Sequence, residues 1–182
     1  MQKNLKILLF SLLLCSGAFL SCKKNPPQHP TQYANDGFLE YSKKFNKQLK
    51  DDENKDIQIY IQNHPEDYLQ TNAGFFMTRT KMNETRKVQD FDTIRFQYQV
   101  SNMEDELIYS YEDVGEQLIV MGQTSMIPGL EYGLKRMSEG EYAKILLPSV
   151  LGYGVDGDRK DIGIDQPLVI EIKLEDIVNY EN

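Results

Sequence analysis

The sequence has no tryptophan, two cysteines, two histidines and fewer basic than acidic side chains. With 20 basic against 28 acidic residues its formal net charge is −8, which argues against nucleic-acid binding because that function needs a basic face. His29 lies in a proline-rich stretch and His64 precedes Pro65, so we expect both to be solvated loop residues. Without a cluster of ligating side chains, we expect no metal site and no cofactor.

No apolar run reaches the roughly 20 residues that a membrane-spanning helix needs. The longest run, residues 7–20, follows Lys3 and Lys6 and ends at Ser21-Cys22. A basic start, a short apolar core and a small residue before its end are typical of a signal peptide, which we assign to residues 1–21. Its removal takes away two lysines and changes the net charge from −8 to −10.

Residues 19–22, F-L-S-C, resemble the lipobox of bacterial lipoproteins, in which the cysteine becomes the acylated first residue. This resemblance predicts lipidation of Cys22 and a membrane-anchored protein of the cell envelope that faces the periplasm. Simple secretion is the alternative. Residues 23–35 are rich in Pro, Gln and Asn and have little to bury, so residues 22–35 are predicted to be the lipidated cysteine and a flexible spacer.

Residues 36–73 are predicted to be a helical segment with two short helices. The first has apolar residues at spacings of three and four, namely Phe38, Tyr41, Phe45 and Leu49. A charged stretch at 50–56 follows, and a second apolar face at Ile57, Tyr60 and Ile61 ends before Pro65.

From Gly74 onwards the apolar spacing shortens to the alternation of β-strands. We predict strands at 75–79, 93–101, 107–111, 117–121, 141–148 and 168–178. One helix, from Pro128 to about Met137, interrupts them and should pack on the concave side of the sheet. The predicted fold class is therefore α+β: a curved antiparallel sheet wrapped on one short helix, preceded by short N-terminal helices.

Four segments in this half of the chain resemble the FKBP family. Residues 126–134, M-I-P-G-L-E-Y-G-L, and 137–141, M-S-E-G-E, resemble its "V-I-x-G-W/L-x-x-G-L" and "M-x-x-G-E" segments. Residues 147–154, L-P-S-V-L-G-Y-G, resemble "I-P-x-x-L-A-Y-G", and 166–172 resemble the last strand. The resemblance runs over roughly residues 88–178 and implies an FKBP-type domain at 74–182 with peptidyl-prolyl cis-trans isomerase activity on Xaa-Pro segments of exported proteins.

That reaction rotates the peptide bond before proline, against a barrier of roughly 18–20 kcal/mol. No bond is broken, so the catalyst needs an apolar cleft that holds the proline ring and removes water from the amide. The resemblance implies that Tyr153, Tyr98 and Ile127 have catalytic roles, the first through its hydroxyl and the last through its backbone amide. The substrate-binding residues that it implies are Tyr109, Ser110, Met126, Leu130, Ile162 and Ile170.

The sequence also departs from the family pattern at the predicted cleft. Ser110 stands where a carboxylate is usual, Gln117 where a wall aromatic is usual, and Leu130 where tryptophan is commoner. We expect a shallower, wetter cleft and weak turnover. A catalytically weak binding module or scaffold in an envelope complex is one alternative, and a structural lipoprotein that oligomerises through its N-terminal helices is another.

The layout as a whole resembles the gliding-motility-associated FKBP-type lipoproteins of Bacteroidetes. This resemblance implies a role in folding or assembling envelope proteins.

Overall fold

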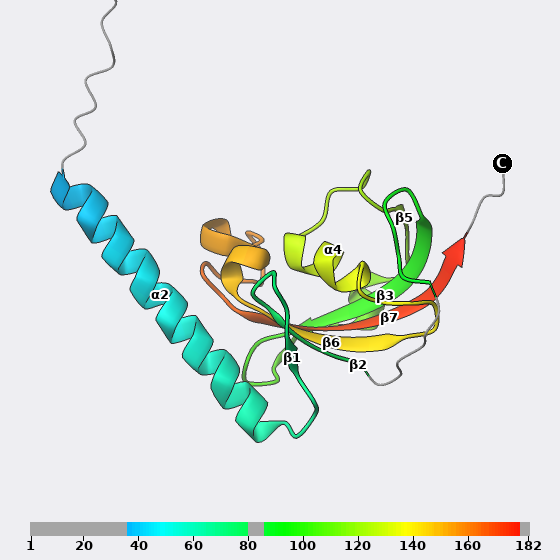
Figure 1. The fold of residues 1–182 in the computed structure, drawn as a ribbon, viewed down its shortest axis with the longest axis horizontal. Coiled ribbons are helices and arrows are strands. Elements are labelled where there is room, and N and C mark those ends of the chain that lie inside the picture. Colours follow the sequence, from blue (N-terminus) through cyan, green and yellow to red (C-terminus); the bar gives the residue numbers. More distant parts are fainter. Residues whose placement is uncertain (1–35, 80–85, 179–182) are drawn as a thin grey trace, which may run out of the picture. The chain divides into compact units, whose positions relative to one another are not determined.

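The computed structural model describes residues 36–79 and 86–178 (Figure 1). The predicted signal peptide, Cys22 and the spacer at 23–35 lie outside these residues. The chain divides into two units, residues 1–39 and 40–182, and of the first unit only the opening turn of a helix is described. Within the described ranges, no helix is both long and apolar enough to pass through a membrane.

The described elements, in chain order, are α2 (Asp36–Asn63), β1 (Leu69–Gln70), β2 (Phe76–Arg79), β3 (Thr93–Ser101), β4 (Leu107–Tyr109), α3 (Tyr111–Val114), β5 (Gln117–Val120), α4 (Pro128–Leu134), β6 (Tyr142–Leu147), the 3-10 turns η2 (Ser149–Leu151) and η3 (Gly154–Asp156), and β7 (Leu168–Val178). All of the predicted strands are present and differ from the prediction only at their ends.

Seven antiparallel strands form one sheet in the order β1-β2-β6-β7-β3-β4, with β5 also paired to β3 (Figure 1). The longest pairing joins β3 and β7, from Thr93 opposite Val178 to Ser101 opposite Val169. One short helix, α4, packs on a face of this sheet, as predicted from the sequence. The α+β fold class is therefore confirmed.

The main core lies between α4 and the sheet. Leu130 and Leu134 of α4 are buried against Ile145 of β6 and Ile170 of β7. Gly129 allows this close approach, because a Cβ atom there would lie 2.5 Å from Leu147 Cδ1 and 2.9 Å from the carbonyl oxygen of Leu151. The helix ends before the predicted Met137, whose amide donates to the Leu134 carbonyl in a tighter, i to i−3 turn.

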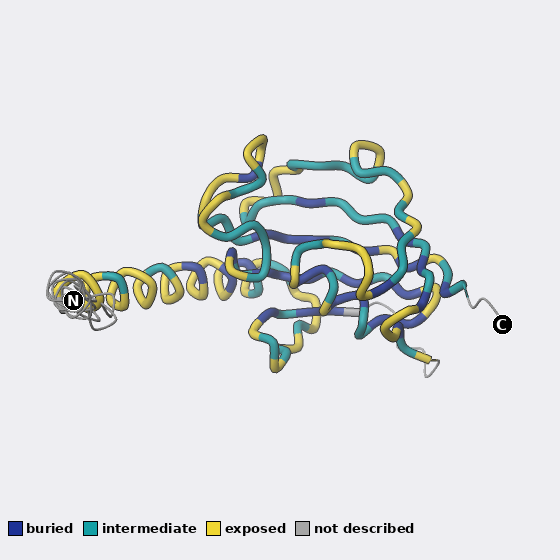
Figure 2. Tube along the Cα trace, turned by 90° about the horizontal axis from the view of Figure 1, so that it is seen from above, coloured by how far each residue is buried: buried dark blue, intermediate teal, exposed yellow. Residues whose placement is uncertain are grey.

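The prediction of two short N-terminal helices was wrong, since residues 36–63 form one helix. The charged stretch at 50–56 contains neither proline nor glycine, so nothing in it interrupts the helical backbone. Burial begins in the second half of α2 (Figure 2), where Ile57 and Tyr60 form a second core with Leu146 and Val169.

His64 closes the end of α2 and is half-buried, which corrects the expectation of a solvated loop residue. Its ring stacks on Tyr60 at 3.8 Å, and its Nε2 lies 3.1 Å from Oδ2 of Asp105. The Tyr60 hydroxyl donates to Oδ1 of the same carboxylate at 2.9 Å. Asp105 therefore ties the end of α2 to the turn between β3 and β4.

Candidate active site

A cleft of about 590 Å³ opens beside α4, over the end of the sheet that carries β3 and β5. Three segments line it: β3 with β5, the start of α4 with the turn that leads into it, and residues 152–157, which include η3. Its lining residues are Phe96, Tyr98, Gln117, Ile119, Thr124, Ser125, Met126, Ile127, Pro128, Leu130, Gly152, Tyr153, Asp156 and Gly157. Apolar and aromatic groups dominate this list, as expected of a small-ligand cleft.

The floor and one wall of the cleft come from the main core. Phe96 is 2% and Leu130 is 3% exposed, so both present an apolar surface that is otherwise covered by protein. The ring of Tyr98 lies along that of Phe96, with centroids 5.9 Å apart and an interplanar angle of 20°. Alternation along β3 places these two rings on the same face of the strand.

The backbone before α4 forms a second side of the cleft. Ile127 is the N-cap residue of α4 in extended conformation, and its carbonyl accepts hydrogen bonds from Leu130 and Glu131 at 3.2 and 3.3 Å. Pro128 at the first helical position has no amide hydrogen to satisfy. Met126 and Ile127 are half-buried and pack against the main core.

Tyr153 lies between η2 and η3 and forms the third side. Gly157, at the end of η3, has φ +61°, and a Cβ there would lie 2.4 Å from the Ile162 carbonyl oxygen, so the turn requires glycine. The Gly154 carbonyl accepts the Asp165 amide at 2.8 Å, which closes the loop behind Tyr153.

Burial raises the pKa of the Tyr98 phenol, and burial with the nearby Tyr98 and Asp158 raises the pKa of Tyr153. Both phenols are therefore protonated at neutral pH. A protonated phenol at the rim can donate a hydrogen bond to a peptide carbonyl.

The predicted residues Tyr98, Met126, Ile127, Leu130 and Tyr153 thus line one cleft, whereas Tyr109 and Ser110 do not. The Tyr109 hydroxyl donates to Asp158 instead, and the Lys160 ammonium lies 4.9 Å from the centre of its ring. Ser110 is the N-cap of α3: its hydroxyl accepts the Asp113 amide at 3.1 Å, and Asp113 accepts the Ser110 amide at 2.9 Å.

Ile162 and Ile170 do not line the cleft either, but belong to the main core. Ile170 is fully buried and pairs with both Ile145 and Val100 on neighbouring strands. Ile162 is 3% exposed, and its amide donates to Asp158 at 2.8 Å. Both belong to the same core cluster as Leu130, which lines the cleft, and their contact with substrate stays a prediction.

Sequence reasoning missed Phe96, Ile119 and Asp156 as lining residues. The alternation of β3 had placed Phe96 on the same side as Tyr98, which was a usable signal. Asp156 belongs to a turn whose path no sequence periodicity predicts. It is the one charged residue among the described residues of the cleft lining.

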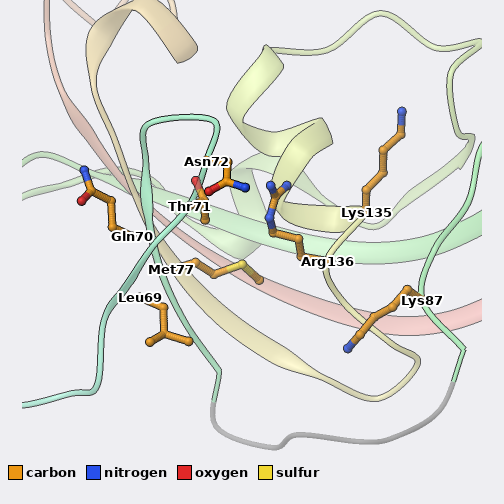
Figure 3. Close-up of a pocket in the computed structure, with 8 residues that line it drawn as sticks. All are labelled: Leu69, Gln70, Thr71, Asn72, Met77, Lys87, Lys135 and Arg136. Carbon is orange, nitrogen blue, oxygen red and sulfur yellow. The ribbon is translucent and has the colours of Figure 1, made fainter.

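A second hollow of about 420 Å³ lies near β1 and the end of α4, and Lys87, Lys135 and Arg136 are among the residues that line it (Figure 3). Lys135 pairs with Asp90 at 2.7 Å and with Glu131 at 2.8 Å, and Lys87 lies 3.7 Å from Glu141. Carboxylates therefore offset these two lysines, and this hollow is a poorer ligand site than the cleft.

The fold and the cleft define the class of protein: an α+β domain whose short helix α4 and curved sheet enclose an apolar, phenol-rimmed binding site. Residues 84–175 match the family of FKBP-type peptidyl-prolyl cis-trans isomerases. This match covers half of the chain, and the chain belongs to that family.

Curated relatives include the peptidyl-prolyl cis-trans isomerase FKBP9 of Homo sapiens, which is 34% identical over 95 residues, 52% of this chain and 17% of that protein. FKBP11 of Bos taurus is 31% identical over 83 residues, 46% of this chain and 41% of that protein. The chain thus spans less than half the length of either relative.

Solved structures share the fold. FkpA from Escherichia coli superposes with a TM-score of 0.59 at 19% identity, over 97% of this chain and 82% of that one. A peptidyl-prolyl cis-trans isomerase from Pseudomonas syringae gives a TM-score of 0.55 at 19% identity, over 67% of this chain and 90% of that one.

Proposed function

We propose that this protein catalyses cis/trans isomerisation of Xaa-Pro peptide bonds in exported proteins. The observation that carries the proposal is the gathering of Tyr98, Leu130 and Tyr153 around one cleft in a domain of this family. The cleft offers the proline ring a buried apolar floor, while the phenols offer hydrogen bonds to the backbone.

The chemistry requires the twisted amide to be held more tightly than either planar form. Removing water from the amide favours the twisted form, because twisting reduces the amide dipole that water stabilises. The Ile127 amide and the Tyr153 hydroxyl are the groups assigned to the substrate carbonyls. No covalent intermediate is needed, and the uncatalysed step takes tens to hundreds of seconds.

An isomerisation assay on an Xaa-Pro peptide tests this proposal. We expect the protein to accelerate the exchange and Tyr153→Phe to lower kcat/KM about tenfold, the effect of one lost hydrogen bond of about 1.4 kcal/mol. Tyr132→Phe is the matched control, because Tyr132 lies on the exposed side of α4 and outside the cleft. No acceleration by the unsubstituted, folded protein would refute the proposal.

A second candidate is a binding module that holds proline segments without rapid turnover. Two observations favour it: Ser110 and Tyr109 make hydrogen bonds outside the cleft, and Gln117 occupies the wall. Binding of a proline peptide at this cleft, seen in amide chemical shifts, together with no acceleration of its isomerisation would favour the module over the enzyme.

We further propose that the protein acts in the cell envelope, anchored by a lipid on Cys22, and assists folding or assembly of envelope proteins, including those of gliding motility. The F-L-S-C sequence and the apolar run before it support this proposal. Cys22→Ala should move the protein from the membrane fraction to the soluble fraction. Unchanged membrane association in that variant would contradict the anchor.

A further inference from the structure

Glu53 of α2 is a carboxylate in the protein interior, only 6% exposed. One of its oxygens accepts the Ser149 amide at 3.1 Å, and the other accepts the Ser149 hydroxyl. Ser149 is itself 4% exposed. Across the described part of the chain, no basic side chain forms an ion pair with Glu53. Both hydrogen bonds to the Glu53 carboxyl group therefore come from one serine.

Ser149 lies three residues before Gly152, which lines the cleft. It begins η2, and its carbonyl accepts the Gly152 amide at 2.8 Å. Gly152 and Tyr153 line the cleft. The carbonyl of Leu151, within the same turn, faces Gly129 at the start of α4. A shift of Ser149 would therefore move the Tyr153 side of the cleft and its contact with α4.

A carboxylate at position 53 is not needed to dock α2 on the sheet. Ile57 and Tyr60 already do so through the second core. Burying a charge is unfavourable unless hydrogen bonds compensate it, and an apolar side chain would fill the same place at less cost. The carboxylate instead fixes the position of Ser149, because it accepts one hydrogen bond from the Ser149 backbone and one from its side chain.

We propose that Glu53 is a positioning residue of the prolyl cleft, which holds η2 and thereby the Tyr153 wall through Ser149. Glu53 itself is not part of the cleft lining and touches no substrate. The proposal rests on the isomerase function proposed above. It means that the second half of α2 helps to position the cleft.

Variants of the full chain test this role. Glu53→Ala leaves the buried Ser149 donors without a partner, whereas Glu53→Gln keeps an oxygen acceptor for one of them. Asp52→Ala is the matched control, because it removes the same charge from the same helix at an exposed neighbouring position. The readouts are kcat/KM on an Xaa-Pro peptide and amide hydrogen exchange by NMR.

For Glu53→Ala we expect kcat/KM to fall about tenfold, the scale of one unsatisfied buried donor. Exchange of the Gly152 amide should become faster, while exchange in the paired centre of β3 and β7 stays as it was. Glu53→Gln should recover most of the activity, and Asp52→Ala should change neither readout. Ser149→Ala, which removes one of the two bonds, should fall between the unsubstituted protein and Glu53→Ala.

A lower melting temperature for Glu53→Ala with unchanged kcat/KM and unchanged Gly152 exchange would overturn the proposal. So would an equal loss of activity in Asp52→Ala. If Glu53→Ala does not fold, Glu53→Gln and Ser149→Ala decide by the same two readouts. If the unsubstituted protein shows no isomerase activity, the proposed function fails by itself, and Gly152 exchange in the variants still decides whether Glu53 holds the wall.

Discussion

The α4 side of the cleft and the β4–α3 segment, which was predicted to form the other side, differ in where their side chains are directed. On the α4 side, Met126 and Ile127 line the cleft, and Tyr153 belongs to the same lining. On the β4–α3 side, Tyr109 binds Asp158 and Ser110 binds Asp113, so both satisfy their polar groups within the protein. The α4 side therefore lines the cleft, whereas the polar groups of Tyr109 and Ser110 are bound within the protein, outside the lining.

If the α4 side depends on close packing, its glycine should be the most sensitive position. Gly129→Ala places a methyl group 2.5 Å from the Leu147 side chain and 2.9 Å from the Leu151 carbonyl. We expect a loss of about 2 kcal/mol in the free energy of unfolding, from overpacking, and a loss of isomerase activity as α4 is displaced. Urea unfolding with the activity assay measures both.

Gly115→Ala on the opposite side is the comparison. Gly115 has φ +72° and ψ 177°, a backbone conformation that essentially only glycine adopts. A methyl group added there would have no atom within 4 Å, so its cost is backbone strain alone, about 1–3 kcal/mol. We expect activity in the folded fraction to persist in this variant. Equal effects of the two substitutions on kcat/KM would contradict the difference between the two sides.

A substitution at Gln117, the first residue of β5, should increase isomerase activity. Gln117 supplies an amide to the cleft wall where an apolar ring would cover the proline. Gln117→Phe loses the hydrogen bond to the Val114 carbonyl, 3.0 Å long, at a half-buried position where water can replace it. Covering about 50 Å² more apolar surface is worth about 1.3 kcal/mol, or about tenfold in kcat/KM. Leu118→Phe, at an exposed position on the same strand, should leave the rate unchanged.

Asp156 gives the rim of the cleft a negative charge that both sides share. A peptide with lysine beside the proline should be turned over a few-fold faster than one with glutamate, because exposed charge pairs are worth up to about 1 kcal/mol. Asp156→Lys should reverse the order, and salt should reduce the difference. Asp161→Lys, outside the lining, is the control. If Asp156→Lys still prefers the peptide with lysine, the preference is due to another group.

The sequence was enough to predict the strands, α4 and the α4 side of the cleft, because each depends on local spacing and on motifs of neighbouring residues. The β4–α3 side could not be predicted in this way. Tyr109 and Asp158 are 49 positions apart, and no sequence periodicity predicts a hydrogen bond between a phenol and a distant loop. The Glu53–Ser149 pair spans 96 positions, and Glu53 lies in a charged stretch whose composition suggested a break in the helix.

The hydrogen bond between Tyr109 and Asp158 gives the smallest expected effect, a change in the pH dependence of stability. Burial raises the pKa of Asp158, but hydrogen bonds from Tyr109 and from the Ile162 and Lys160 amides lower it, and the net pKa is below the ordinary value. The stabilisation is therefore fully present above the unfolded pKa of about 3.9 and is lost as the pH falls through the lower folded value.

Tyr109→Phe removes one of the bonds that lower the Asp158 pKa, so less of the variant's stability should depend on pH. We expect the variant to be less stable at pH 7 and the gap from the unsubstituted protein to narrow below about pH 4, measured by urea unfolding across this range. Its kcat/KM should stay unchanged, because Tyr109 does not line the cleft. If the difference in unfolding free energy is constant with pH, the Tyr109 ring acts through packing. A loss of kcat/KM would mean that Tyr109 contacts the substrate, as the family resemblance implied.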